Sequence, residues 1–160
     1  MRILGIDPGY AIIGFGVLDY DGRRFTPLEY GAVTTEAGLP FPERLRQIFE
    51  DTEFIFDRFK PDCLAIEKLF FTTNQKTGID VAQARGVTVL SAAKRGIPVH
   101  EYTPLQVKSA VVGYGKAEKF QVMEMTRQLL GLAQIPKPDD AADALAVAIC
   151  HAHSSQLTVS

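Results

Sequence analysis

The sequence contains few cysteines and no long apolar run. Cys63 and Cys150 are the only cysteines among 160 residues, and both have apolar neighbours and no paired spacing. This pattern argues against a zinc site or a disulfide framework. Apolar stretches are broken by charges or glycines well before the roughly 20 residues that a membrane-spanning helix needs, and the N-terminus has no signal-peptide pattern. We therefore expect a cytoplasmic protein with two buried thiols and no membrane segment.

The sequence also lacks a strong net charge. A formal charge of −2 gives no global sign of nucleic-acid binding, yet residues 68–119 hold eight basic and three acidic side chains. A basic segment of this kind suits a polyanionic partner. The alternative is that these lysines and arginines are solvated charges on helix faces, and the sequence alone does not show that they share a face.

No internal repeat or low-complexity segment is present. The apolar content of 46% and the ordinary charge content are typical of a folded chain with a substantial core. We predict one domain over residues 1–153, followed by a short tail at 154–160.

Apolar periodicity predicts the order of the strands and helices. An Asp21-Gly22 hairpin joins the second and third strands, and Thr103-Pro104 is typical of a helix start. Strands are expected at 2–6, 12–20, 25–34, 63–67 and 97–102, and helices at 42–59, 78–94, 104–112, 117–130 and 139–153. This order predicts an α/β protein with a mixed five-stranded sheet, three antiparallel strands plus two parallel ones, covered by helices on both faces.

Four acidic residues stand where this fold would bring them together. Asp7 and Glu67 each end a buried strand, and Asp140 and Asp143 open the last helix with a spacing of three, which places both on one helix face. A carboxylate at such a position is costly to desolvate unless a positive charge compensates it. The four acids therefore predict an oxygen-ligand site for Mg²⁺ or Mn²⁺.

Each acid has a simpler interpretation when it is taken alone. Asp7 could cap the turn that follows it, and Glu67 could mark the point where its strand reaches solvent. Adjacent acids at a helix start are common capping groups, and Asp139 is the candidate cap. The argument for a site rests on the four together.

Small residues accompany the acids in the sequence. Gly14 and Gly16 follow the first acid and would let backbone approach a metal ion or a phosphate. The alanines among residues 141–146 would let the last helix lie close to the strands that carry Asp7 and Glu67.

One of two phenylalanines and two lysines are further candidates for DNA contact. Phe70 and Phe71 follow Glu67, and we expect one in the core and the other free to stack on an unpaired base. Lys108 and Lys119 could contact phosphate, although solvent-exposed helix charges are the simpler interpretation of both.

These residues resemble the RuvC Holliday-junction resolvases of bacteria, a family of the ribonuclease H-like nuclease superfamily. The resemblance covers nearly the whole chain. It is carried, in the same order, by residues 3–9, 65–67 with Phe70, 83–87, 106–119 and 140–146.

The resemblance implies a ribonuclease H-like fold and a homodimer that nicks two strands of a four-way DNA junction symmetrically. Asp7, Glu67, Asp140 and Asp143 would be its catalytic metal ligands, holding two Mg²⁺ ions in each site, with Mn²⁺ able to substitute. The resemblance also assigns Phe70 to junction opening or stacking, assigns functional roles to Lys108 and Lys119, and makes the helix with residues 83–87 the dimer helix. The family works with a branch-migration motor, and cleavage would leave 5′-phosphate and 3′-hydroxyl ends.

Two other functions are compatible with parts of the pattern. An actin-like or sugar-kinase-like ATPase also opens with an acid followed by glycines, but such enzymes need two lobes, and 160 residues leave no room for the second. A junction-binding module without catalysis would use the basic segment and not the acids.

Overall fold

The computed structural model describes residues 1–69 and 75–156. The strands are β1 (Arg2–Asp7), β2 (Ile12–Tyr20), β3 (Phe25–Thr34), β4 (Cys63–Glu67) and β5 (Val99–Tyr102). The helices are α1 (Phe41–Phe59), α2 (Gln75–Lys94), α3 (Pro104–Val112), α4 (Lys119–Leu130) and α5 (Asp139–Gln156).

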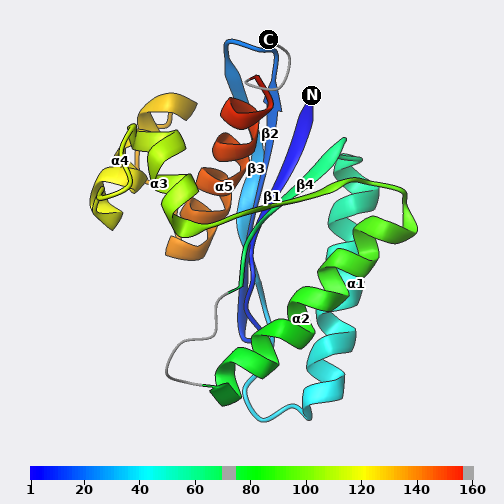
Figure 1. The fold of residues 1–160 in the computed structure, drawn as a ribbon. Coiled ribbons are helices and arrows are strands. Elements are labelled where there is room, and N and C mark those ends of the chain that lie inside the picture. The colour runs from blue at the N-terminus through cyan, green and yellow to red at the C-terminus, as the bar shows by residue number, and fades with distance from the viewer. Residues whose placement is uncertain (70–74, 157–160) are drawn as a thin grey trace.

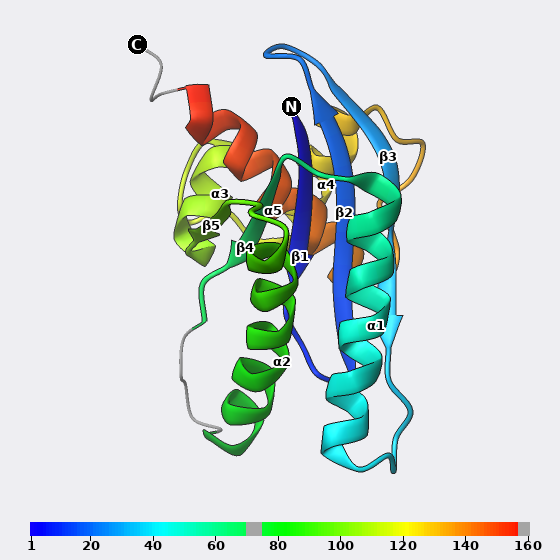
Figure 2. The same ribbon diagram turned by 90° about the vertical axis from the view of Figure 1, so that its right-hand side faces the viewer.

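The strands form one mixed sheet in the order β3-β2-β1-β4-β5. The pairs β1–β2 and β2–β3 are antiparallel, whereas β1–β4 and β4–β5 are parallel. Helices α1 and α2 cover one face, and α3, α4 and α5 lie on the other (Figures 1 and 2). The predicted sheet, its mixed pairing and its two covered faces are therefore confirmed.

Alternation along the central strands separates two cores. Leu4 and Ile6 of β1 pack in the cluster under α1 and α2, while Ile3 belongs to the cluster under α5. Side chains alternate between faces along a strand, so the later odd positions of β1, Gly5 and Asp7, also face α5. The face of the sheet that receives α5 is thus also the face that receives the strand-end acid.

Several element boundaries differ from the prediction. Helix α2 begins at Gln75 rather than near residue 78, so part of the predicted loop is helical. Strand β5 begins at Val99 rather than residue 97, because the Ile97 amide closes a turn on the Ala92 carbonyl (3.0 Å) instead of joining the sheet. Helix α4 begins at Lys119 because Glu118 is extended (φ −78°, ψ 158°).

The C-terminal end of α5 also differs from the prediction: the helix continues to Gln156, beyond the predicted end at residue 153. No helix within residues 1–69 and 75–156 is both long and apolar enough to cross a bilayer.

Candidate active site

Strand register brings Asp7 and Glu67 side by side. Ile6 of β1 pairs with Ile66 of β4 in parallel register, and each acid is the next residue on its strand. Cys63 and Ala65 of β4 pack in the α5-side core, so alternation also directs Glu67 toward α5. Two acids that are 60 positions apart in the sequence therefore leave the sheet on the same edge and the same face.

Close packing of α5 on the sheet brings the helix acids to the strand acids. A Cβ placed on Gly5 would lie 2.1 Å from the Ala144 carbonyl oxygen, and one on Gly14 would lie 1.9 Å from that of Asp140. Gly14 is also the β2 partner of Asp7. The predicted use of Gly14, approach to a metal or phosphate, is therefore wrong: the glycine makes room for the backbone of α5.

The four carboxylates act on one another, and the effect is strongest at Asp7. Burial, and after it the negative charges of Asp143, Glu67 and Asp140, together raise the pKa of Asp7 to about 8. Every group that shifts this pKa raises it, so the negative charge on Asp7 is uncompensated within the described part of the chain. This is the electrostatic setting that a bound cation would relieve.

Glu67 and Asp143 have the same character, moderated by lysine. Burial raises the pKa of Glu67, Asp143 adds to the rise, and Lys119 and Lys108 oppose it. Burial also raises the pKa of Asp143, against which Lys119 acts through its charge and a hydrogen bond. The Lys119 Nζ lies 3.6 Å from the Asp143 Oδ2 and 3.8 Å from the Asp139 Oδ2.

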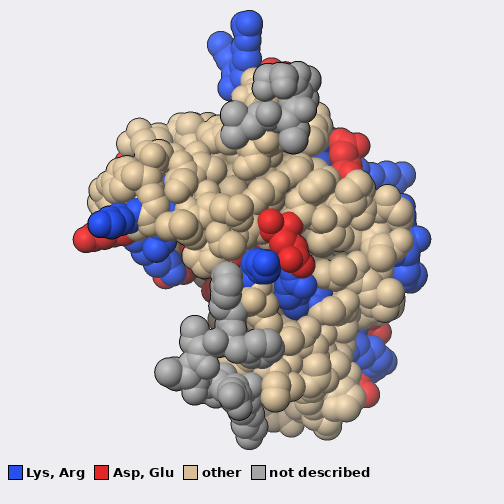
Figure 3. Space-filling model, viewed as in Figure 1, with Lys and Arg blue, Asp and Glu red and all other residues tan. Residues whose placement is uncertain are grey.

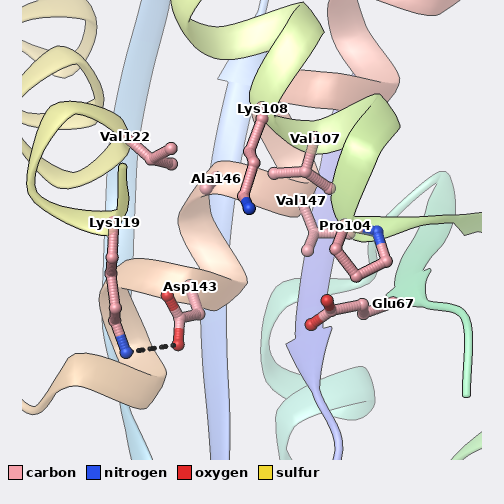
Figure 4. A pocket seen from close by; sticks show the side chains of 9 residues that line it. All are labelled: Glu67, Pro104, Val107, Lys108, Lys119, Val122, Asp143, Ala146 and Val147. Atoms are coloured by element: carbon pink, nitrogen blue, oxygen red, sulfur yellow. Dashed lines mark ion pairs between the residues drawn. The ribbon is translucent and has the colours of Figure 1, made fainter. Parts of the chain in front are cut away.

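A cavity of about 270 Å³ opens between β4 and the three helices of this face. Lys108 and Lys119 reach toward it from α3 and α4, and Glu67 and Asp143 face it from β4 and α5 (Figure 4). The remaining lining is apolar and comes from Pro104, Val107, Val122, Ala146 and Val147. The cavity thus combines two carboxylates, two ammonium groups and an apolar wall. This arrangement suits a phosphate held against a metal site.

The donor set fits a hard divalent cation, because every candidate ligand is a carboxylate oxygen. As the side chains stand, residues 1–69 and 75–156 contain no group of three or more Asp, Glu, His or Cys arranged to hold a metal ion.

The basic segment does not act as one surface. Arg85 pairs with Glu101 at 2.6 Å, while Lys94 and Arg95 both pair with Glu53. On the face of the molecule that Figure 3 shows, the Lys and Arg atoms likewise lie in separate groups and do not form one continuous basic surface. Among the described basic residues of this segment, Lys108 and Lys119 line the cavity.

The other predicted residues have mixed outcomes. Asp140 is half-buried and Asp139 is exposed, so Asp140 is the better-placed ligand of this adjacent pair. Phe70 and Phe71 lie outside the described residues.

Sequence reasoning gave His151 no role, yet its buried ring Nδ1 lies 2.6 Å from the Tyr102 Oη. Tyr102 is the β5 partner of Glu67, so this hydrogen bond ties α5 to the strand beside the acid. The sequence signal that could have indicated this hydrogen bond is Tyr102 itself, an aromatic residue opposite Glu67 in the pair of parallel strands.

A ribonuclease H-like sheet with carboxylates at the ends of two adjacent central strands, faced by acids on the helix across them, defines a nuclease of the ribonuclease H-like class. Comparison with known proteins narrows the class. The family described as "Crossover junction endodeoxyribonuclease RuvC" matches residues 3–151. The chain belongs to the RuvC family, a family of nucleases that use divalent metal ions.

Individual relatives agree with this assignment. The chain is 58% identical over 152 residues to the crossover junction endodeoxyribonuclease RuvC of Brevibacillus brevis, covering 95% of this chain and 92% of that one. It is 56% identical over 158 residues to the enzyme of the same name from Alkaliphilus oremlandii, covering 99% and 96%.

Among solved structures, Thermus thermophilus RuvC superimposes with a TM-score of 0.92 at 35% identity, covering 99% of this chain and 97% of that one. A structure described as T. thermophilus RuvC in complex with Holliday junction substrate gives 0.95 at 36% identity, with coverage of 99% and 96%.

Proposed function

We propose that this chain is an endonuclease that resolves four-way (Holliday) DNA junctions by paired symmetric nicks, leaving 5′-phosphate and 3′-hydroxyl ends. The observation that carries the proposal is the meeting of Asp7, Glu67, Asp140 and Asp143 in a chain of the RuvC family. A relative of the same fold has been solved with a Holliday junction substrate, which supports the choice of DNA substrate.

The proposed cofactor is Mg²⁺, two ions in each site, with Mn²⁺ able to substitute. Asp7 would be the shared ligand because it is coupled to the other three acids, and Glu67, Asp140 and Asp143 would complete the set. When bound, such ions activate water and stabilise the leaving 3′ oxygen.

The residues of the chain itself would then orient the phosphate. Lys108 and Lys119 enter the cavity from different helices, so they could hold a phosphate from two sides. Lys119 is paired with Asp143 at 3.6 Å, and it would turn toward the developing negative charge once a cation neutralises that carboxylate. The apolar wall would limit water to the attacking side.

The proposed homodimer would form through α2. Ile79, Gln83, Gly86 and Leu90 follow one another at helical spacing, and all four are exposed. Ile79 is 53% exposed and Leu90 is 55% exposed, which is unusual for large apolar side chains and suits burial against a second copy. Two copies related by a two-fold axis would present two cavities to the two-fold symmetric junction.

Two further inferences rest on the family. We infer that the dimer acts together with a branch-migration motor on chromosomal DNA, and therefore in the cytoplasm. Co-sedimentation of the protein with such a motor on a four-way junction, with a linear duplex as control, would test the partnership.

The decisive experiment incubates the protein with a labelled four-way junction, a linear duplex of the same sequence, and Mg²⁺, Ca²⁺ or chelator. We expect paired incisions on the junction alone, and with Mg²⁺ or Mn²⁺ alone. Cleavage of the linear duplex at the same rate would identify a general nuclease instead.

Asp7→Asn separates catalysis from binding. It removes one negative charge and keeps the side-chain shape, so junction binding should persist while cleavage is lost. Full cleavage by this variant would refute the catalytic assignment. Leu90→Glu should give a monomer in sedimentation and single nicks in place of paired ones.

A further inference from the structure

Three large apolar side chains are exposed on α3, on α4 and on the turn that joins these two helices. Leu105 is 62% exposed, Tyr114 is 47% exposed and Phe120 is 68% exposed. Leu105 directly follows Pro104, and Phe120 directly follows Lys119, and both of these neighbours line the cavity. We call Leu105, Tyr114 and Phe120 the apolar rim. Exposed apolar groups gathered beside a functional cavity indicate a contact surface.

The apolar rim is held in place by the turn that joins α3 to α4. The Gln121 side-chain Nε2 donates a hydrogen bond to the Tyr114 Oη at 2.6 Å, and the Gln121 Oε1 accepts one from the Glu118 amide at 2.8 Å. Leu105 lies over Gly115, since a Cβ placed on that glycine would be 2.4 Å from its Cδ1. Tyr114 is therefore fixed against the first turn of α4, the turn that also carries Phe120.

Lysines outnumber acids beside the apolar rim, since Lys116 and Lys119 stand against Glu118, and this balance favours a polyanion as the occupant. Lys116 is exposed two positions after Tyr114, and Lys119 precedes Phe120. The Lys108 and Lys119 side chains reach the cavity beside it. A surface that alternates aromatic rings with ammonium groups binds unpaired nucleic acid, because the rings stack on bases and the lysines follow the phosphates. A patch built for a protein partner would instead be depleted of lysine at its centre.

We propose that Phe120 and Tyr114 form a stacking platform for an unpaired base of the strand whose phosphate enters the cavity. This proposal rests on the proposed function, because it takes a branched DNA as the ligand. The platform would hold one nucleotide out of the duplex beside the scissile phosphate. It would thereby contribute to the selection of the cleavage position.

The test measures binding of the full-length protein, in the Asp7→Asn background, to four-way junctions that carry one abasic site at successive positions around the cut. Phe120→Ala should weaken binding of the intact junction by about 5- to 150-fold, and Phe120→Tyr should restore it. For one position of the abasic site, the protein that retains Phe120 should bind the abasic junction as weakly as Phe120→Ala binds the intact junction. The two losses should not add there, because the stacking contact is already absent.

Phe54→Ala is the matched control, since Phe54 is 63% exposed on α1, across the sheet. It should bind every junction as the parent does. The proposal is overturned if Phe120→Ala also binds as the parent does, or if its loss adds to that of every abasic site, as a contact with phosphate or protein would. Failure of the parent itself to bind junctions would refute the proposed function instead.

Discussion

The backbone of Gly14 touches the backbone of Asp140: a Cβ on the glycine would lie 1.9 Å from the Asp140 carbonyl oxygen and 2.9 Å from the Asp140 Cβ. Gly14 pairs with Asp7 across β1 and β2. Gly14 therefore acts with Gly5, whose added Cβ would lie 2.1 Å from the Ala144 carbonyl oxygen, to set how closely the α5 acids approach the strand acid.

Gly14→Ala should push the start of α5 away from the sheet. We expect a loss of stability of about 1–3 kcal/mol, the usual range for overpacking, and a loss of metal-dependent cleavage larger than the loss of stability explains. Urea unfolding and junction cleavage measure the two effects.

Gly16→Ala is the comparison for Gly14→Ala, because the added Cβ would meet the Leu145 Cδ2 at 2.5 Å. Leu145 is fully buried, so this variant also overpacks the core, but its clash is mainly with a side chain and not with the backbone that carries Asp140. Cleavage should survive better in Gly16→Ala than in Gly14→Ala at equal fraction folded. Equal cleavage by the two folded variants would show that Gly14 does not position Asp140.

Asp7→Asn should stabilise the protein in chelator at neutral pH. The folded pKa of Asp7 is raised from 3.8 to about 8, so its contribution to stability is fully present below about pH 4 and is lost as the pH rises through about 8. At pH 7 folding must therefore bind a proton to Asp7 that the unfolded chain has lost, and removing this cost should gain roughly 1–3 kcal/mol after allowance for solvent and relaxation. Urea unfolding with chelator at pH 7 and pH 5 measures the gain, which should shrink at the lower pH.

Added Mg²⁺ should make the parent more stable than Asp7→Asn, the reverse of the order expected in chelator. An ion that binds only the folded state stabilises it by about 2.7 kcal/mol at 100 times its dissociation constant, and the variant lacks the charge that binds it. Mg²⁺ should thus raise the Tm of the parent more than that of Asp7→Asn. An equal rise in both would show that Asp7 is not a ligand.

The sheet and the meeting of the acids could be predicted because they follow from periodic patterns. Asp7 and Glu67 each end a short apolar strand, and neighbouring parallel strands present their carboxyl ends at the same edge of a sheet. The spacing of Asp140 and Asp143 is also a local property of a helix. Local pattern and simple topology were sufficient for these features.

Other features depend on packing and could not be read from the sequence. Gly14 makes room for the backbone of α5, which lies more than 120 positions away in the sequence. The sequence could not show this contact, so the glycine was expected to approach a metal ion or a phosphate instead. Lys108 and Lys119 had solvated helix charges as their simpler interpretation. Both line the cavity because of the angle at which α3 and α4 pack on α5, and that angle is set by side-chain fit rather than by periodicity.

Lys119→Met should impair cleavage more than binding. The ammonium group lies 3.6 Å from the Asp143 Oδ2 and lines the cavity, so its loss removes a positive charge near the reacting phosphate. We expect the single-turnover cleavage rate to fall by about 10²-fold, the scale measured for removal of one transition-state donor. Junction affinity should change far less, because one of several phosphate contacts is lost.

Lys94→Met is the control for charge alone, since Lys94 pairs with Glu53 at 2.9 Å on the far side of the sheet. This variant should cleave at the parent rate. If the two lysine variants lost cleavage equally, the effect would be one of net charge, and a specific role for Lys119 would be refuted.

The buried His151, which is hydrogen-bonded to the half-buried Tyr102, should make stability fall in mild acid. Burial, with the nearby His100, lowers the pKa of His151 from 6.5 to about 4, so the unfolded chain takes up a proton that the folded chain excludes. The contribution is complete above about pH 6.5 and is lost as the pH falls toward 4. His151→Asn offers an acceptor oxygen in place of Nδ1, and between pH 7 and pH 5 it should lose on the order of 2 kcal/mol less unfolding free energy than the parent.

Tyr102→Phe keeps the titrating ring and removes only the 2.6 Å hydrogen bond, so it should be less stable by about 1 kcal/mol at pH 7 and retain the pH dependence of the parent. Urea unfolding of the three proteins at both pH values decides the matter, and an unchanged pH dependence in His151→Asn would show that another group is responsible.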